Sequence, residues 1–240
     1  MQAKPFNFFD QLLKSILDHR PGVLSRLCFE RVSFGPCLTA VTLSDGSPGV
    51  ASNSTPESDS GPGKMIPEQM RYKGPFSPGR ITGETLAEFF LQPPPISRID
   101  SLRTACLNAL SVPLIENGNY RLMADTDPFD CLRFNSAQKI VMVGAFRSYI
   151  RRLREMELNF KVLELRPEAM AGEEKDYYTP ASKAAELIPK ADVVIITGMT
   201  LVNQSLESLL KLINPSQQVM LSGPSASLIP DVFFAQGISL

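Results

Sequence analysis

The stretch Asp192–Asn203, with the sequence DVVIITGMTLVN, constrains the fold more than any other part of the chain. Its run Val193–Ile196 is β-branched at every position, whereas a strand with one solvent-exposed face alternates apolar and polar residues. The run therefore predicts a fully buried strand of a parallel sheet. A polar turn at Thr197-Gly198 follows, and the apolar spacing after it predicts a helix over 204–212.

The residues that follow this strand are candidates for a ligand site, because open α/β sheets bind ligands at the carboxyl ends of their strands. This turn contributes Thr197, Gly198, Thr200 and Asn203. The alternative is structural, with Gly198 only allowing the chain to turn and Asn203 only capping the next helix. The stretch alone leaves both interpretations open.

Strands and helices alternate through the second half of the chain. The pattern predicts strands over 140–143, 160–165, 193–196 and 218–221, with helices over 147–156, 182–189 and 204–212. This alternation is typical of a doubly wound parallel sheet. We therefore expect an α/β domain over residues 138–240.

The first half predicts an α+β domain over residues 1–115, joined to the second by a connecting segment at 116–137. Its strands are expected over 23–34, 38–43 and 49–51 as an antiparallel meander, and its helices over 6–17, 82–91 and 97–110, with Thr82 as the cap of the second helix. The stretch Ser52–Pro78 is rich in Ser, Pro and Gly, which predicts a long loop or a mobile flap.

Composition excludes several classes of function. The net charge of -1 leaves no broad basic field, so nucleic acid is not an expected partner. No apolar run is long enough to span a bilayer and no signal peptide is apparent, so we expect a cytoplasmic protein without a membrane partner. None of the 4 cysteines lies in a Cys-x-x-Cys pair and His19 is the single histidine. A zinc finger is therefore excluded, and the cysteines are expected to be core residues of a reducing compartment.

The turn after the first predicted parallel strand tests for dinucleotide binding. A Gly-x-Gly-x-x-Gly sequence is expected there, but only Gly144 is present, and Phe146 and Arg147 would crowd a pyrophosphate. Glu164 does end the next strand, where an acidic residue contacts a ribose hydroxyl. On balance, ordinary NAD is not expected as a cofactor.

Two charged motifs each allow a functional and a structural interpretation. The acidic stretch Asp125–Asp130 could hold a hard cation, but it lacks the Gly and Glu of an EF-hand loop, which favours a polar turn with a helix cap. Arg147, Arg151 and Arg154 share one helix face. They could form an anion patch, but such a row more often forms a solvated face.

The stretch Gly223-Pro224-Ser225 ends the last predicted strand. Backbone N–H groups at the start of a following helix would point toward an anion or a carbonyl oxygen. Ser225 is not followed by the Gly of a nucleophile elbow, and His19 is distant in sequence. A serine hydrolase is therefore poorly supported.

The stretches that end these strands resemble a family of unknown function described as "Putative heavy-metal chelation". In the second half the resemblance rests on 144–146 (GAF), 164–167 (ELRP), 191–203 (ADVVIITGMTLVN) and 223–226 (GPSA), and in the first half on 38–43 (LTAVTL), 45–46 (DG) and 105–110 (ACLNAL). It thus covers nearly the whole chain. The resemblance implies an enolase N-terminal-like domain followed by a Rossmann-like domain.

The resemblance also implies a ligand site in a cleft between the two domains. Carried over residue by residue, that site comprises Glu164, Thr197, Gly198, Thr200, Asn203, Gly223, Pro224 and Ser225, with Asn108 from the first domain. Two features depart from the family pattern. Met199 stands where a small polar residue is more usual, and the chain ends at Leu240, where a missing last strand would leave the sheet edge bare.

Soft heavy metals prefer thiolate and imidazole ligands, and these candidates include neither. Glu164, the weak candidate for a metal ligand, suits a hard cation or a polar organic ligand better. We therefore expect binding of a small polar or anionic ligand, including a metal ion or a metal chelate, in this cleft.

Two alternatives remain open. The first is an enzyme acting on a small-molecule metabolite at the same cleft, with Glu164 as acid/base and Ser225 or the turn N–H groups holding an oxyanion. The second is a scaffold that docks partners through the loop at 52–78. The sequence also leaves homo-oligomer formation open.

Overall fold

The computed structural model describes residues 8–53, 81–94, 96 and 98–239, so the predicted loop lies outside the described residues from 54 onward. The chain forms two compact units. We call the first the N-terminal unit; it comprises Met1–Tyr120, Leu201–Gln204 and Pro224–Val232. We call the second the C-terminal unit; it comprises Arg121–Thr200, Ser205–Gly223 and Phe233–Leu240. The predicted domain boundaries stay predictions.

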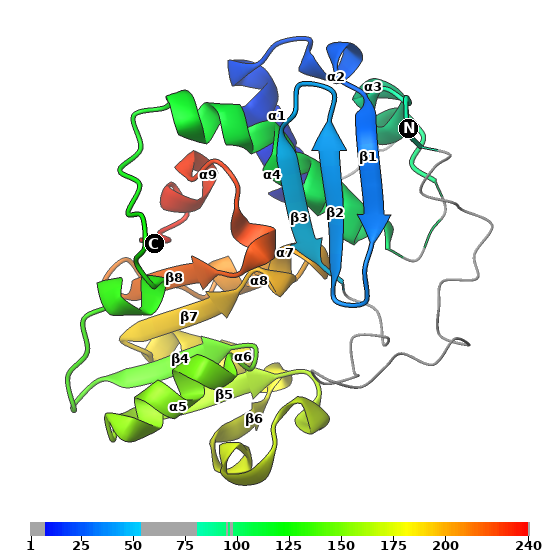
Figure 1. Ribbon diagram of the computed structural model, residues 1–240. Coiled ribbons are helices and arrows are strands. Elements are labelled where there is room, and N and C mark those ends of the chain that lie inside the picture. The colour runs from blue at the N-terminus through cyan, green and yellow to red at the C-terminus, as the bar shows by residue number, and fades with distance from the viewer. Residues whose placement is uncertain (1–7, 54–80, 95, 97, 240) are drawn as a thin grey trace, which may run out of the picture. The chain divides into compact units, whose positions relative to one another are not determined.

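The N-terminal unit contains a three-stranded antiparallel sheet in the order β1-β2-β3 (Figure 1), as the meander predicted. The hairpin between β2 and β3 turns at Gly46, whose φ of 82° favours glycine. The elements with their bounds are α1 (Phe8–His19), α2 (Val23–Arg26), β1 (Phe29–Phe34), β2 (Leu38–Leu43), β3 (Pro48–Ser52), α3 (Leu86–Leu91) and α4 (Ile99–Asn117).

Two local predictions in this unit were wrong. The strand expected over 23–34 begins only at Phe29, because Gly22 adopts a left-handed φ of 72° and the chain then forms the short helix α2. The cap of α3 is Thr85 and not Thr82. Thr85 and Glu88 form a reciprocal capping box, in which each side chain accepts a hydrogen bond from the other residue's N–H.

Helix α4 is longer than the predicted helix over 97–110, because it continues through Pro113 to Asn117. Every residue from Thr104 to Ser111 is buried, so the helix has no solvent face there from which a period could be read. It packs against β3 at Gly49, where an added Cβ would lie 2.1 Å from the carbonyl oxygen of Ala105. Glycine is what permits this close approach of strand and helix.

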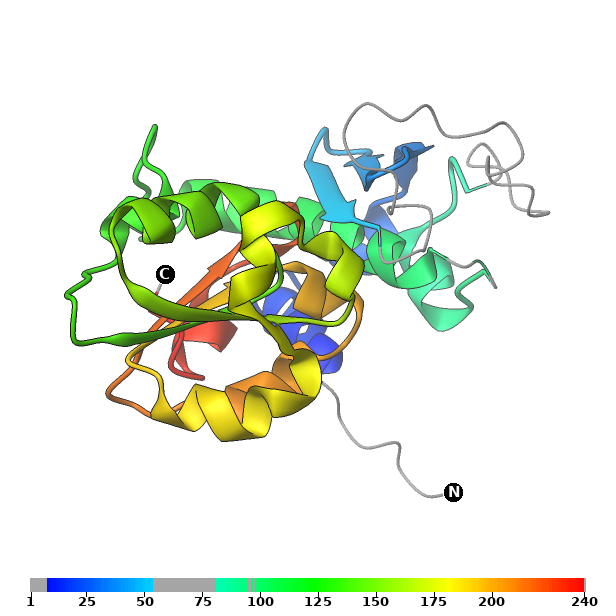
Figure 2. The same cartoon turned by 90° about the horizontal axis from the view of Figure 1, so that it is seen from below.

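The C-terminal unit contains a five-stranded parallel sheet in the order β6-β5-β4-β7-β8. Helices lie on both of its faces (Figure 2). The elements are η4 (Pro128–Cys131), β4 (Lys139–Val143), α5 (Arg147–Glu155), β5 (Asn159–Glu164), η5 (Pro167–Ala169), η6 (Gly172–Tyr177), β6 (Tyr178–Pro180), η7 (Ala181–Lys183), α6 (Ala184–Leu187), η8 (Ile188–Lys190), β7 (Val193–Thr197), α8 (Leu206–Leu210) and β8 (Gln218–Ser222). The predicted mixed α/β class with a doubly wound parallel sheet is confirmed.

The burial of β7 explains its β-branched sequence. All four residues Val193–Ile196 have 0% exposure, so neither face of the strand meets water. Val193 and Ile195 join a core cluster that also contains Ile150 and Leu153 of α5. Their neighbours along the strand point to the opposite face of the sheet and are equally buried.

The short elements around this sheet differ from the predictions. Strand β6 has only three residues and was not predicted. The helix expected over 204–212 is replaced by α7 (Met199–Val202) and α8, separated by Gln204 with a φ of 59°. The helix expected over 182–189 is α6 flanked by the 3₁₀ turns η7 and η8.

Further short turns follow β8, namely η9 (Pro224–Ala226) and α9 (Asp231–Phe234). The N–H of Ser239 donates to the carbonyl oxygen of Val219 at 2.8 Å, so the chain lies against the outer edge of β8 at this point. No helix within the described part of the chain has the length and apolar character needed to cross a membrane.

Candidate functional site

The strand order of the C-terminal unit reverses between β4 and β7, and the carboxyl ends of these two strands are in direct contact. Gly144 follows β4 with a φ of 90°, and an added Cβ there would lie 2.6 Å from Cγ2 of Thr197. Such a reversal is the topological switch point at which open α/β sheets bind ligands. The backbone of Gly144, which has no side chain, therefore contacts the hydroxyl-bearing side chain of Thr197 at this switch point.

The turn after β7 is held by its own polar groups. The hydroxyl of Thr200 donates to the carbonyl oxygen of Thr197 at 2.6 Å, and the N–H of Gly198 donates to the carbonyl oxygen of Ser222 at 2.7 Å. The Thr197 hydroxyl accepts from the N–H of Met199 at 3.3 Å. Thr200 is buried and supports the turn, whereas half-buried Thr197 can still donate its own hydroxyl hydrogen to a ligand.

Glu164 ends β5 and joins two turns through its carboxylate. One carboxylate oxygen accepts from the N–H of Leu165 at 2.8 Å and of Arg166 at 3.2 Å, and the other accepts from the N–H of Ala145 at 3.1 Å. A carboxylate offers about four lone-pair sites. Glu164 thus positions the turn after β4 and retains one acceptor site for a ligand hydroxyl or a cation.

Helix α5 begins beside this turn without a side-chain cap. Phe146 occupies the cap position without a capping hydrogen bond, and the first turn contains no acidic residue. The first N–H groups of an α-helix have no partner within the helix and favour an anion. The start of α5 therefore adds donors to the same end of the sheet.

Arg147, Arg151 and Arg154 form a solvated face of α5, and two of them form ion pairs with neighbouring residues. Arg147 lies 3.9 Å from the carboxylate of Glu174, and Arg154 pairs with Glu173. Arg151 is exposed. The interpretation favoured by the sequence therefore describes these side chains better than an anion patch.

The acidic stretch at 125–130 also follows the favoured structural interpretation. Asp127 caps η4 by accepting from the N–H of Phe129 at 2.9 Å, and it accepts from the hydroxyl of Tyr149 at 2.7 Å. Burial, followed by this hydrogen bond, raises the pKa of Tyr149 to about 12. Arg152 pairs with Asp127 at 3.5 Å and with Asp130. Across the described residues, no group of three His, Cys, Asp or Glu side chains is placed to hold a metal ion.

The remaining candidates divide between the units. Gly223 lies in the C-terminal unit, whereas Asn108, Asn203, Pro224 and Ser225 lie in the N-terminal unit. The predicted cleft site that would combine these residues stays a prediction.

Within the N-terminal unit, Asn108 and Ser225 support the local fold. The buried Asn108 amide donates to the carbonyl oxygens of Val50 at 2.5 Å and Pro224 at 3.0 Å. The buried hydroxyl of Ser225 accepts from the N–H of Ser52 at 2.8 Å. Both side chains thus attach the turn at 224–226 to β3. Asn203 is exposed, and Ser205 occupies the cap position of α8.

A pair of sulfur atoms in the C-terminal unit was not recognised from the sequence. Sγ of Cys131 lies 4.0 Å from Sδ of Met123, and the Met123 residue is 51% exposed. The two residues lie in a stretch without periodicity, so only the folded chain brings them together. Among the other cysteines, Cys106 is buried as expected, but Cys37 is exposed and is not a core residue.

A doubly wound parallel sheet with glycine and threonine at its switch point defines an α/β unit. Residues 127–240 match the model of the DUF364 family, described as "Putative heavy-metal chelation". The resemblance noted in the sequence is thereby confirmed for this segment.

Solved structures of that family share the fold. A protein of unknown function from Pyrococcus horikoshii is 19% identical, with a TM-score of 0.70 over 96% of this chain and 84% of that chain. A second protein of unknown function, from Desulfitobacterium hafniense DCB-2, is 17% identical, with a TM-score of 0.64 over the same shares, 96% and 84%. No curated protein matches the sequence.

Proposed function

We propose that the carboxyl end of the parallel sheet binds a small polar or anionic ligand, including a metal ion carried as a chelate. We call this region the strand-end site; its residues are Gly144, Glu164, Thr197, Gly198 and Gly223. The observation that carries the proposal is the contact between Gly144 and Thr197 beside the uncapped start of α5. Because Gly144 has no side chain, a ligand can reach the backbone N–H groups at the switch point.

The chemistry of these groups selects the class of ligand. The Thr197 hydroxyl and the first amides of α5 can donate to an anionic oxygen, while Glu164 can accept from a hydroxyl or contact a hard cation. None of the five residues of the strand-end site has a thiol or an imidazole. A soft metal would therefore reach this site as a chelate, held through the oxygen atoms of its organic part.

The residues of the N-terminal unit enter this proposal only as structural supports, because the amide N–H groups of Asn108 already donate to Val50 and Pro224 and the hydroxyl oxygen of Ser225 already accepts from Ser52. The same contacts weaken the enzyme alternative. Glu164 already accepts from three N–H groups, and Ser225 accepts from Ser52. These contacts do not favour Glu164 as an acid/base group or Ser225 as a donor to an oxyanion. Ligand binding is therefore the better-supported function.

We expect native mass spectrometry of protein purified without chelators to show an excess mass that disappears on denaturation. Thr197→Val keeps the shape of the side chain but removes its hydroxyl, so retention of the excess mass should fall roughly tenfold, as for the loss of one hydrogen bond. The matched control is Thr42→Val on β2, which should retain the ligand. An unliganded parent protein, or equal retention by both variants, would contradict the proposal.

The sulfur pair of Cys131 and Met123 supports a second candidate function, the binding of a soft monovalent ion. Thiolate and thioether are the donors that such ions prefer. With metal–sulfur bonds of about 2.3 Å, the value for zinc thiolates, two sulfurs 4.0 Å apart could share one ion. The second candidate explains a heavy-metal association without any contribution from the strand-end site.

We expect silver ion, titrated calorimetrically against the protein in the presence of a competing monothiol, to bind tightly with one equivalent. Cys131→Ser should abolish this equivalent, and Met123→Leu should weaken it by about tenfold, because one of the two donors is lost. Cys37→Ser removes an exposed thiol and serves as the control that keeps the equivalent. Unchanged binding by the Cys131 variant would exclude the sulfur pair as the site.

A further inference from the structure

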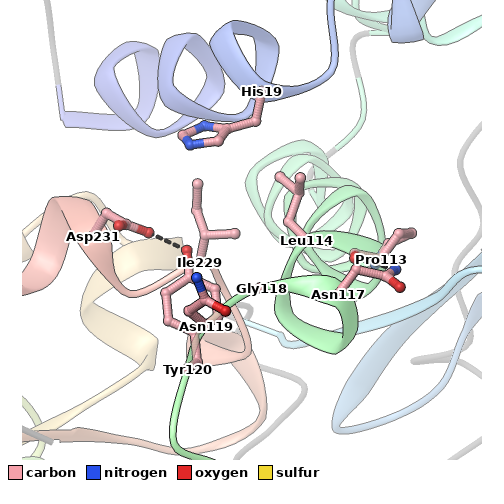
Figure 3. Close-up of a pocket in the computed structure, with 9 residues that line it drawn as sticks. All are labelled: His19, Pro113, Leu114, Asn117, Gly118, Asn119, Tyr120, Ile229 and Asp231. Atoms are coloured by element: carbon pink, nitrogen blue, oxygen red, sulfur yellow. Dashed lines mark hydrogen bonds between the residues drawn. The ribbon is translucent and has the colours of Figure 1, made fainter.

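A pocket lies wholly within the N-terminal unit and plays no part in the strand-end site. It has a volume of about 440 Å³. Figure 3 shows that its walls come from the ends of α1 and α4, from the residues just after α4 and from the segment around α9. The residues that matter for its chemistry are His19, Leu114, Asn119, Tyr120, Ile229 and Asp231.

The electrostatic character of this pocket is negative. His19 is the last residue of the 12-residue helix α1, and Asn117 is the last residue of the 19-residue helix α4, so two helix C-termini reach the pocket. Each C-terminus carries a partial negative charge of roughly half an electron. Asp231, the first residue of α9, adds a carboxylate, and the described residues that line the pocket include no Lys or Arg. These features favour a cation.

The polar side chains present hydrogen-bond acceptors. Nδ1 of His19 lies 2.8 Å from the carbonyl oxygen of Ser15, and the tautomer with its hydrogen on Nδ1 donates there and leaves Nε2 as an acceptor. The hydroxyl of Tyr120 donates to one oxygen of Asp231 and orients the carboxylate. Burial and the neighbouring Asp231 raise the pKa of Tyr120 to about 12, so Tyr120 remains a donor to Asp231 at neutral pH.

The pocket also has an apolar wall. Leu114 and Pro113 are half-buried and line the pocket, together with Ile229, which is 1% exposed. A ligand that fits must therefore combine a hydrogen-bonding cationic head with a short apolar body. A bare divalent metal ion fits poorly, because His19 and Asp231 are the only side chains of the types that commonly ligate metals among the described residues that line the pocket.

We infer that this pocket binds a small organic ammonium ion, a protonated primary amine on a short aliphatic chain. The ammonium group donates to Asp231 and to Nε2 of His19, and the aliphatic carbons contact Leu114. This site is independent of the strand-end site, and its existence does not rest on the function proposed there.

The test is a titration of the full chain with n-butylammonium chloride, followed by two-dimensional NMR. We expect saturable shifts that include His19 and Tyr120, with weaker binding of the uncharged isostere butan-1-ol and none of butyrate. Asp231→Asn keeps an acceptor oxygen for Tyr120 but removes the charge, and it should weaken butylammonium binding about tenfold. His19→Phe removes the second acceptor and should weaken it severalfold.

Glu186→Gln provides the matched control, because Glu186 is an exposed carboxylate of the C-terminal unit that pairs with Lys183. It should leave butylammonium binding unchanged. Thermal melting of each variant checks that the fold persists, and the His19 variant keeps the test decisive if the Asp231 variant does not fold. Equal binding of butan-1-ol, equal binding by the charge-removing variant, or absence of saturable shifts would each overturn the inference.

Discussion

Replacing Gly49 with alanine is expected to destabilise the protein by about 3 kcal/mol, the upper part of the range for overpacked cores. The new Cβ would lie 2.1 Å from the carbonyl oxygen of Ala105, 2.6 Å from the backbone N of Ala109 and 2.9 Å from its Cβ. Two of these are main-chain atoms of α4 and cannot move by a rotamer change. Helix α4 and strand β3 must therefore separate. Chemical denaturation, with the free energy of unfolding extrapolated to water, measures the effect.

The control for this substitution is Gly46→Ala in the hairpin turn. Gly46 has a φ of 82°, but an added Cβ would meet no atom within 4 Å. Its cost is therefore conformational alone, about 1–2 kcal/mol for a left-handed alanine. If Gly49→Ala proved as stable as Gly46→Ala or more stable, α4 would not pack against β3 as closely as described.

Replacing Gly144 with alanine is expected to have a comparably large effect, a destabilisation of about 2–4 kcal/mol that combines left-handed strain with overpacking. Its φ is 90°, and the added Cβ would lie 2.6 Å from Cγ2 and 3.0 Å from Cβ of Thr197. Because both residues belong to the strand-end site, the ligand detected with the parent protein should be lost as well. Denaturation and native mass spectrometry together measure the two effects.

The double variant Gly144→Ala/Thr197→Ser separates the two causes. Serine lacks the Cγ2 methyl group that the new Cβ would meet first. The double variant should therefore be about 1 kcal/mol more stable than the sum of the two single-variant effects predicts. The backbone strain at residue 144 should remain. Strictly additive effects would mean that the ends of β4 and β7 are not in contact.

Much of the C-terminal unit could be predicted because its signals are local. The apolar run of β7 is buried on both faces, and each long parallel strand begins and ends within one residue of its predicted bounds. By contrast, Val23–Arg26 was predicted as part of a strand but forms α2, because Gly22 redirects the chain after α1. The three-residue β6 depends on its pairing with β5 and has too few residues to show a period.

The candidate site shows the same division. Gly144, Glu164 and Thr197 were recognised as strand-end residues, or as parts of the family resemblance, from sequence alone. Asn108 and Ser225 were recognised from the resemblance, but their hydrogen bonds to Val50, Pro224 and Ser52 became visible only in the folded N-terminal unit. Residue identity could suggest a polar group at these positions but could not specify its partner.

The sequence by itself determined the α/β class, the parallel strands and the absence of thiol and imidazole from the strand-end candidates, because each follows from periodicity or composition over a short stretch. Only the tertiary structure decided which turns touch, which polar groups have hydrogen-bond partners and which residues distant in sequence come together. The Gly144–Thr197 contact, the Met123–Cys131 sulfur pair and the pocket of His19 and Asp231 join residues separated along the chain. Such proximity follows from packing of the whole unit, which no local pattern encodes.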